Sequence, residues 1–343
     1  IGQGSYLTDG KAGMSSGKSV TERLFSFFAR ANYSYQDKYM LSASIRHEGS
    51  SKFAADNRWA NFWSATAGWR ISNEEFMKDF DWLDDLKIRF GYGVTGNNDF
   101  SATYMANMLG SDTNWMMPNG TWAYSYGKSQ NVNPNLGWEE KKEWNLGVDY
   151  SFFEGRLYGK FDYYRREVDN LLFSVKVPQP PYTQGSQMQN IGSMESKGWE
   201  FEVGGDIIRT KDFTWPSSMN LSHNTGKILT LEGDNSYHNG NGFVAPGTPG
   251  DAARMEAGST IGSFYMWKFA GFDDEGSFLL YNKDGEVIPA AQKTENDKQY
   301  IGNYTPKLII GWSHTLTYKN FDLGINLRSW IDFDVYNTIN MYY

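Results

Sequence analysis

The sequence lacks cysteine altogether, and it contains no apolar run long enough to cross a membrane as a helix. Without cysteine there is no disulfide framework, no thiolate metal site and no cysteine nucleophile. A transmembrane helix needs about 18 or more consecutive apolar residues, so this class is excluded. Membrane-spanning strands are not excluded, because they alternate in polarity and carry a much weaker hydropathy signal.

Basic residues are fewer than acidic residues. The 343 residues include 32 Lys and Arg against 40 Asp and Glu, which gives a net charge of −8. Nucleic acids are bound through basic faces, so this balance argues against a nucleic-acid partner. The four histidines are scattered, and none stands near a serine nucleophile motif of the G-x-S-x-G type. No catalytic constellation is recognisable.

Aromatic residues, in contrast, are abundant: 17% of the chain is Phe, Tyr or Trp. Many of them lie in segments that alternate between apolar and polar residues. In one such segment, Leu146 and Val148 fall on one face, and Glu143 and Asp149 fall on the other. A tight break at Glu154-Gly155 follows, and the alternation then resumes. This pattern predicts a hairpin of two strands that each bury one face.

The same alternation predicts ten strands in five successive pairs. Their ranges are 24–35 with 39–47, 63–71 with 86–94, 144–153 with 157–164, 199–208 with 213–228, and 308–318 with 321–330. Residues 72–80 open like a capped helix, with Ser72 at the cap and acidic residues in the first turn.

The last pair shows the alternation most clearly. Leu323, Ile325 and Leu327 share one face of their strand, and Asn326 and Arg328 lie on the other. An apolar face of this kind suits lipid, and the polar face suits a water-filled lumen. Tyr and Trp beside the turns suit the headgroup layer, where an amphipathic ring meets both environments.

Short turns alternate along the chain with long polar excursions, which cover residues 48–61, 95–138, 175–196 and 232–304. Such loops are uncommon in compact soluble domains. Bacterial membrane barrels have them outside and short turns on the periplasmic side. A soluble sandwich or propeller would explain the alternation equally well, but not the loop lengths or the aromatic turn flanks. We therefore predict an all-β chain, a fragment of an antiparallel transmembrane β-barrel with about ten spanning strands.

Several phrases, in order, resemble the SusC/RagA family of TonB-dependent outer-membrane transporters of the Bacteroidota. They are FARANYSYQDKYMLSASIRHEGSSKFAADNRWANFWSATAGWRISNEEFMKD, IRFGYGVTGNND, NPNLGWEEKKEWNLGVDYSFFEGRL, NIGSMESKGWEFEV and YIGNYTPKLIIGWSHTLTYKNFDLGINL. Each phrase alone is a weak signal, but together they are specific and cover nearly the whole chain.

This resemblance implies a barrel of about 22 strands whose lumen is plugged by a globular domain. The chain shows no plug-like domain and no TonB box, and its end, DVYNTINMYY, lacks the usual final-strand Phe. We therefore expect residues 1–343 to be one domain, approximately the C-terminal half of the barrel. The resemblance also implies the partners: a SusD-like surface lipoprotein, the TonB complex acting through the missing N-terminal part, and outer-membrane lipid.

Aromatic residues in two excursions are candidate ligand-binding residues. They are Trp115, Trp122, Tyr124 and Tyr126 in 95–138, and Tyr265 and Trp267 in 232–304. The first four lie among Asn, Ser and Gly, and flat rings beside amides and hydroxyls suit sugar or peptide recognition. Packing of the loops against their neighbours or a partner is the alternative, slightly preferred for Tyr265 and Trp267.

Two short acidic stretches, 272–276 and 282–286, combine oxygen ligands with turn glycines. A structural calcium ion would suit them, but they fall far short of a full EF-hand loop, and ordinary hairpin turns are favoured. We expect no other metal and no cofactor.

The function that these observations favour is TonB-dependent import of a nutrient oligomer across the outer membrane, with oligosaccharide preferred over oligopeptide. Import needs no covalent chemistry, so no catalytic residues are expected. A non-transporting β-rich glycan-binding module or adhesin is the alternative. An outer-membrane enzyme would need a converging acid/base pair in the lumen, and none is recognisable.

Overall fold

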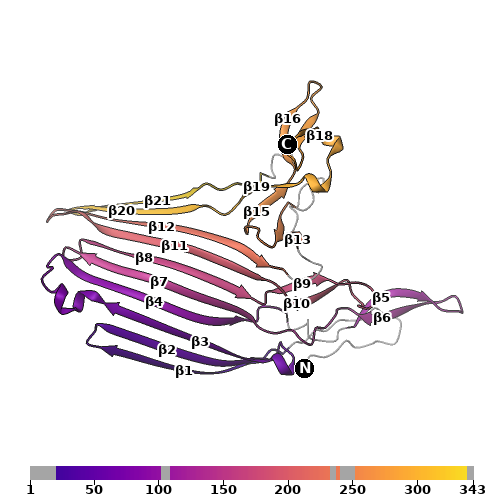
Figure 1. Ribbon diagram of the computed structural model, residues 1–343, viewed down its shortest axis with the longest axis horizontal. Helices are drawn as coiled ribbons and strands as arrows, with labels where there is room; N and C mark the ends of the chain where they lie inside the picture. The colour runs from indigo at the N-terminus through magenta and orange to yellow at the C-terminus, as the bar shows by residue number, and fades with distance from the viewer. Residues whose placement is uncertain (1–20, 102–108, 232–236, 240–251, 338–343) are drawn as a thin grey trace.

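One large antiparallel sheet dominates the computed structural model, which describes residues 21–101, 109–231, 237–239 and 252–337 (Figure 1). The sheet has ten strands in the order β1-β2-β3-β4-β7-β8-β11-β12-β20-β21, so consecutive spanning strands are always neighbours. Their bounds are β1 Leu24–Tyr35, β2 Tyr39–Ser50, β3 Trp59–Arg70, β4 Leu83–Asn97, β7 Glu139–Phe152, β8 Leu157–Asp169, β11 Ser193–Arg209, β12 Phe213–Thr230, β20 Leu308–Tyr318 and β21 Phe321–Ile331. The predicted number of spanning strands is confirmed.

Small sheets and turns occupy the long connections, which leave the large sheet at one end (Figure 1). These elements are η1 Ala55–Asn57, β5 Leu109–Met116, β6 Trp122–Lys128, β9 Leu172–Lys176, β10 Ser186–Asn190, β13 Tyr237–Asn239, β14 Arg254–Glu256, β15 Ser263–Met266, β16 Lys268–Phe272, β17 Phe278–Tyr281, β18 Val287–Pro289, η5 Ala290–Gln292, η6 Glu295–Asp297 and β19 Gln299–Asn303. The β16–β17 pair is the small hairpin predicted within 232–304. Among the described residues, no helix is long and apolar enough to span a membrane.

The helix predicted at residues 72–80 was wrong. Two short 3-10 turns, η2 Ile71–Asn73 and η3 Glu75–Met77, take its place. Ser72 donates its hydroxyl to Asp85 at 3.0 Å instead of capping a helix. Glu74 accepts hydrogen bonds from Tyr39 at 2.6 Å and Trp69 at 3.1 Å, and these bonds, Tyr39's foremost, lower the pKa of the Glu74 carboxyl. The polar groups that resembled a cap bind this turn to the neighbouring strands.

The first face of the large sheet is apolar across strands. Val148 lies opposite Phe161, which lies opposite Phe201 and then Leu221 and Ile310 on the following strands. In-register partners share a face, so these residues form a continuous belt. No second layer covers this belt in the part of the chain that the structure describes, and the exposed fractions of Leu146, Leu323, Ile325 and Leu327 range from 40% to 56%. The alternative of two stacked sheets is thereby excluded.

The second face is polar, as the residues next to the apolar ones on the same strands show. Asp149 lies opposite Lys160, which lies opposite Glu202 and then Asn220. Glu143, Asn326 and Arg328 share this face by register. The predicted separation of the two sets of residues is therefore confirmed.

The apolar belt has defined upper and lower limits on β7. Phe152, beside the turn, packs against Trp82 with ring centres 5.6 Å apart, and Trp144 stands at the opposite limit. Beyond Trp144 the same face becomes charged, where Lys142 pairs with Asp169 at 2.6 Å. Residues 144–152 rise by about 3.4 Å each, or about 27 Å along the strand. This length matches the apolar band of about 25 Å of outer-membrane barrels, given that their strands tilt.

Val148 stands midway along this belt, so Val148→Arg should lower the free energy of unfolding by about 2–4 kcal/mol. Asn145→Arg, on the polar face of the same strand, is the matched control and should cost much less. Urea titration of the protein refolded in lipid vesicles measures both changes. Equal costs for the two variants would contradict the assignment of the faces.

Candidate functional site

The polar face carries a charge network centred on Arg89 of β4. Its Nε and Nη2 atoms donate to Asp149 of β7 at 2.7 and 2.8 Å, in the forked geometry typical of strong Arg–carboxylate pairs. Nη2 also donates to both carboxylate oxygens of Asp162 on β8, at 3.2 Å. One guanidinium thus connects three adjacent strands.

Gly147 makes this connection possible. β7 lies between β4 and β8, and Gly147 is the residue in register between Arg89 and Asp162. A Cβ atom built on Gly147 would lie 2.6 Å from both Arg89 Nη2 and Asp162 Oδ1. Only a residue without a side chain leaves the guanidinium room to reach across the strand.

Further ion pairs follow the network along the same face. Lys160 pairs with Glu202 at 3.1 Å, and Glu143 accepts from Arg166 at 2.8 Å and from Lys141 at 3.3 Å. All these side chains remain about a third to a half exposed, so each pair adds little to stability. Together these ion pairs make the polar face hydrophilic, with each positive charge close to a negative one.

An aromatic cluster fixes the loops to the sheet. Phe53 packs against Phe100 and Trp138 with ring centres 5.2 and 4.9 Å apart, and Phe62 lies 5.3 Å from Trp138. Leu136 completes this buried group. It joins the connection after β2, the connection after β4 and the start of β7, so these loops share one rigid base.

Asparagine side chains extend that base. Asn131 Nδ2 donates to the carbonyls of Gln184 and Ser186 at 2.6 and 2.9 Å. Asn190 completes the pairing at the other end: its Oδ1 accepts from the N–H of Gly137 at 2.7 Å, and its Nδ2 donates to the Gly137 carbonyl at 2.9 Å. Residues 131–137 are thereby held along β10 as an additional strand would be. Lys128, the last residue of β6, lies only three positions before Asn131.

The β5–β6 hairpin carries the predicted residues Trp115, Trp122, Tyr124 and Tyr126. Its backbone register sets Trp115 opposite Ala123, Trp122 opposite Met116, and Tyr124 opposite Asn114. A tight turn closes it, with Gly120 at φ 78°. Figure 1 shows the hairpin extending beyond the end of the large sheet. The side chains of the four aromatic residues lie outside the described part of the structure.

Tyr265 of β15 is engaged by neighbours in its own excursion. Arg254 donates to its hydroxyl at 2.7 Å and lies 4.8 Å from its ring centre, and the Tyr300 ring is 5.1 Å away. Tyr300 in turn donates to Glu256 at 2.7 Å. Burial, followed by this hydrogen bond, raises the pKa of Tyr300 to about 12, so it remains a neutral donor.

Trp267 is also engaged by neighbours within its own excursion. Its Nε1 donates to the carbonyl of Thr294 at 2.8 Å, and the ammonium groups of Lys298 and Lys293 lie 4.5 and 5.1 Å from its ring centre. The contacts of Tyr265 and Trp267 lie within residues 254–300, and Figure 1 shows β15 apart from the β5–β6 hairpin. The structure does not bring the two groups of predicted residues into one site.

Phe269, Phe272 and Phe278 form an exposed cluster on the β16–β17 hairpin that the sequence analysis missed. Their ring centres are 5.0 to 5.9 Å apart, and each side chain is more than half exposed. Three contiguous exposed rings make this cluster a candidate interaction surface. In the sequence, the three Phe residues flank an acidic turn. Only the pairing of β16 with β17 shows that their rings are in contact.

The acidic stretches proposed for calcium close hairpin turns. Asp273 Oδ1 accepts from the N–H groups of Glu275 and Ser277, and Asn282 Oδ1 accepts from those of Asp284 and Glu286. Within residues 21–101, 109–231, 237–239 and 252–337, no three His, Asp or Glu side chains gather in a way that could hold a metal ion.

The alternating faces, the short turns at one end and the long loops at the other define the wall of an outer-membrane β-barrel. The chain belongs to the TonB-dependent receptor family, since the family model described as "TonB dependent receptor-like, beta-barrel" matches residues 3–337. This membership confirms the predicted family and places the protein in the outer membrane.

Relatives support the same assignment. The chain is 34% identical to the TonB-dependent receptor SusC of Bacteroides thetaiotaomicron over 91% of its length, and 32% identical to the TonB-dependent receptor P26 of Formosa agariphila over 92%. It superimposes on a chain of the RagAB peptide transporter with a TM-score of 0.77 and 27% identity over 90% of its length. The chain spans about one third of these relatives, 32% of both receptors and 33% of the RagAB chain.

Gly147→Ala should displace the Arg89 guanidinium and break its link to Asp162. The expected loss of unfolding free energy is at most about 1 kcal/mol, because the ion pair is partly exposed. Gly324→Ala is the control, since a Cβ there would meet nothing within 4 Å. Urea unfolding, together with a structure of the variant, tests the change. An unmoved Arg89 in that structure would refute this role for Gly147.

Trp138→Ala should loosen the loops, because it removes the centre of their buried cluster. Emptying a buried aromatic site costs about 3–5 kcal/mol. We expect faster proteolysis of residues 51–58 and 131–138, while the heat-resistant migration of the barrel is retained. Phe76→Ala, at an exposed position near the opposite end of the sheet, is the control. Unchanged proteolysis in Trp138→Ala would show that the cluster does not hold the loops.

Proposed function

We propose that this chain forms part of the wall of a TonB-dependent importer that carries a nutrient oligomer, preferably an oligosaccharide, across the outer membrane. The observation that supports it best is family membership over residues 3–337, combined with a sheet that is apolar on one face and charge-paired on the other. The polar face lines the lumen, and the apolar face meets lipid.

The balanced charges of the lumen face favour an uncharged polar cargo. Arg89 is shared between Asp149 and Asp162, and Lys160 is paired with Glu202. Such ion pairs offer many hydrogen-bonding groups but little net electric field. The hydroxyl groups of an uncharged oligosaccharide can therefore form successive hydrogen bonds with them as it moves along the lumen wall. For a strongly charged cargo, we would expect the lumen to carry an excess of the opposite charge.

Cargo capture is assigned to the β5–β6 hairpin. Trp122, Tyr124 and Tyr126 occupy alternate positions of the sequence of β6, in a hairpin that extends beyond the end of the large sheet (Figure 1). Aromatic faces supply apolar area to sugar rings, and the neighbouring amide and hydroxyl groups supply direction. The asparagine-bound segment 131–137 gives this hairpin a fixed base, as binding loops require.

Energy and closure come from partners. The TonB complex supplies the energy for import, and a SusD-like lipoprotein covers the loops. The exposed cluster of Phe269, Phe272 and Phe278 is a surface that such a lid would cover. Without such a lid, these three phenylalanine side chains would be exposed to water.

Oligopeptide is the second candidate cargo. The observation that favours it is the likeness to RagAB, which is described as a peptide transporter. Peptides present amide groups that the same paired charges and aromatic rings can bind.

Uptake assays separate these cargoes. Cells that express the protein with its partner take up fluorescently labelled oligosaccharides or oligopeptides, and a strain without TonB serves as the control. TonB-dependent uptake of oligosaccharide but not of peptide is expected. Surface binding that persists without any TonB-dependent uptake would instead identify a non-transporting binding module.

Replacement of Trp122 and Tyr124 by Ala should weaken cargo binding by roughly ten-fold or more, as the loss of two stacking rings would predict. Barrel assembly should be unaffected, because these residues lie on a projecting hairpin. Met117→Ala, at the exposed hairpin turn, is the control. Isothermal calorimetry and heat-modified migration provide the two measurements. Unchanged affinity would refute this hairpin as the capture site.

A further inference from the structure

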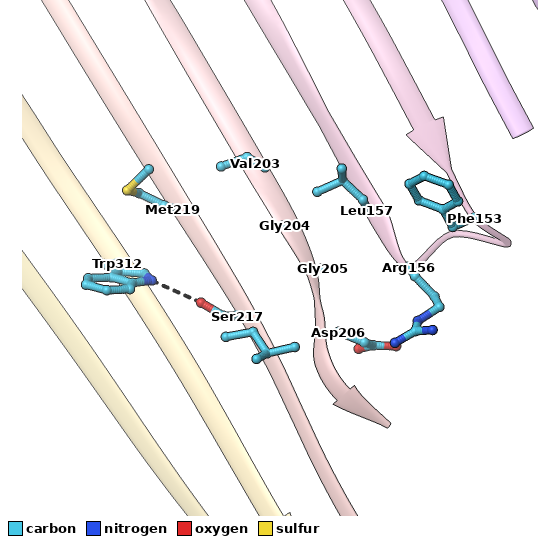
Figure 2. Close-up of a pocket in the computed structure, with 11 residues that line it drawn as sticks. Phe153, Arg156, Leu157, Val203, Gly204, Gly205, Asp206, Ser217, Met219 and Trp312 are labelled. Atoms are coloured by element: carbon cyan, nitrogen blue, oxygen red, sulfur yellow. Dashed lines mark hydrogen bonds between the residues drawn. The ribbon is translucent and has the colours of Figure 1, made fainter. Parts of the chain in front are cut away.

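A groove of about 480 Å³ lies on the apolar face of the sheet, across β8, β11, β12 and β20 (Figure 2). Leu157 lies opposite Gly205, and Gly205 lies opposite Ser217, so two small residues leave a recess between bulkier neighbours. Trp312 donates its N–H to the hydroxyl of Ser217 at 3.0 Å, as Figure 2 shows. Such a recess does not distinguish one apolar occupant from another.

A second hollow, of about 330 Å³, lies on the polar face across β1, β2, β3 and β4. The polar side chains that line it include those of Asn32, Ser42, Thr66 and Lys87, and none of the described lining residues is acidic. Asn32 lies opposite Ser42, and Ser42 lies opposite Thr66, so these three residues form one row across the strands. The volume lies within the range of about 300–1,000 Å³ that small-molecule sites occupy.

Lys87 of β4 differs from the arginines around it. Arg70 pairs with Asp85 at 3.2 Å, and Arg89 pairs with Asp149 at 2.7 Å. Asp85 stands two positions before Lys87, and Asp149 lies opposite Lys87 on β7, so both acidic neighbours are already paired with arginines. Within the part of the chain that the structure describes, the Lys87 side chain forms no ion pair or hydrogen bond.

The Lys87 side chain is directed toward the hollow. A Cβ atom built on Gly68 of β3 would lie 3.4 Å from Lys87 Cε. The lysine stem therefore lies over Gly68, on the side of β4 that is away from Asp149 and β7. Its ammonium group is the cation that the hollow can offer to a ligand, because the other lining cation, Arg89, is shared between two carboxylates.

Arg30 of β1 determines which groups of the hollow are available. Its Nε donates to Asn32 Oδ1 at 3.1 Å and to Ser42 Oγ at 3.2 Å. These bonds use acceptor oxygens, so the amide N–H groups of Asn32 and the O–H of Ser42 remain available as donors. Together with the ammonium group of Lys87 they form a set of donors, and a carboxylate, which only accepts hydrogen bonds, complements such a set.

We propose that this hollow binds one carboxylate group of the cargo as it passes along the lumen wall. The ammonium group of Lys87 pairs with the carboxylate, and Asn32, Ser42 and Thr66 donate hydrogen bonds to it. That this carboxylate belongs to cargo rests on the proposed function, whereas the binding of a carboxylate does not. The group comes from an acidic sugar unit or from a peptide, and the chemistry of recognition is the same for both.

A single unpaired lysine is compatible with the balanced charges of β7, β8 and β11. One carboxylate neutralises it, so cargo that is uncharged along most of its length and carries an occasional acidic unit suits both parts of the wall. An oligomer with a carboxylate on every unit would find no matching excess of positive charge on the described strands β7, β8 and β11.

Nuclear magnetic resonance of the lysine side chains tests carboxylate binding directly. The whole transporter is purified in detergent, and its lysines are methylated with isotopically labelled formaldehyde, which preserves their charge. The Lys87 signal is the one that the Lys87→Arg variant lacks. Galacturonate should shift this signal, whereas its uncharged methyl ester should not. Lys160, which is paired with Glu202, is the internal control. An unmoved Lys87 signal, or an equal shift with the ester, would overturn the proposal.

A second pair of probes separates the two sources of the carboxylate. N-acetylalanine carries a peptide-type carboxylate, and N-acetylalanine amide does not. A larger Lys87 shift with galacturonate supports a site for acidic sugars, and a larger shift with N-acetylalanine supports a site for peptides. Neither measurement requires TonB-dependent uptake, so a failure of the proposed transport function is distinguishable from a failure of this site.

Two variants probe the two kinds of contact. Lys87→Gln should weaken galacturonate binding by roughly ten-fold or more, because it removes a charge-assisted bond. Thr66→Val keeps the shape of the side chain and should weaken binding by about three-fold, as the loss of one neutral hydrogen bond predicts. Thr315→Val, on the polar face of β20, is the matched control.

Ligand-observed magnetic resonance gives the affinities of these variants, and heat-modified migration confirms that each variant is folded. Wild-type affinity in Lys87→Gln, or an equal loss in Thr66→Val and Thr315→Val, would contradict the assignment of the carboxylate to this hollow.

Discussion

The rest of this structure depends on the antiparallel hydrogen-bond ladder between consecutive strands. In the bilayer core no water is present to satisfy a backbone N–H or C=O, so every spanning segment must pair with its neighbours. Once the ladder is formed, the period of two assigns each side chain to lipid or to the lumen, and the register decides which side chains meet across strands. The apolar belt, the Arg89 network and the groove at Gly205 are all consequences of that register.

Glycine serves two different purposes on the two faces. At Gly147 the missing side chain lets a guanidinium cross a strand and join carboxylates on both of its sides. At Gly205 it brings β11 close to the turn before β8 and leaves a recess in the membrane face. In both cases an alanine would alter contacts between strands rather than the strand that carries it.

The fold was predictable where alternation is regular. The bounds of β1 and β20 match the predictions, because both strands lie largely within alternating sequence. β7 begins at Glu139 rather than near Trp144, because beyond the belt both faces are charged and the signal is lost. The turn after β3 was predicted as a helix, since a capping pattern gives no sign that Glu74 binds Tyr39 and Trp69 instead. The sequence placed the aromatic candidates in loops, but the Phe cluster and the groove require knowledge of cross-strand partners.

The early start of β7 has a consequence for the geometry of the cell surface. Residues 139–143 continue the ladder past the belt and add about 17 Å along the strand at about 3.4 Å per residue. The ion pair between Lys142 and Asp169 lies in this extension. The strands of the barrel wall therefore extend beyond the headgroup layer, and the loops begin at the ends of these extended strands. Molecules that reach these loops meet them clear of the lipid surface.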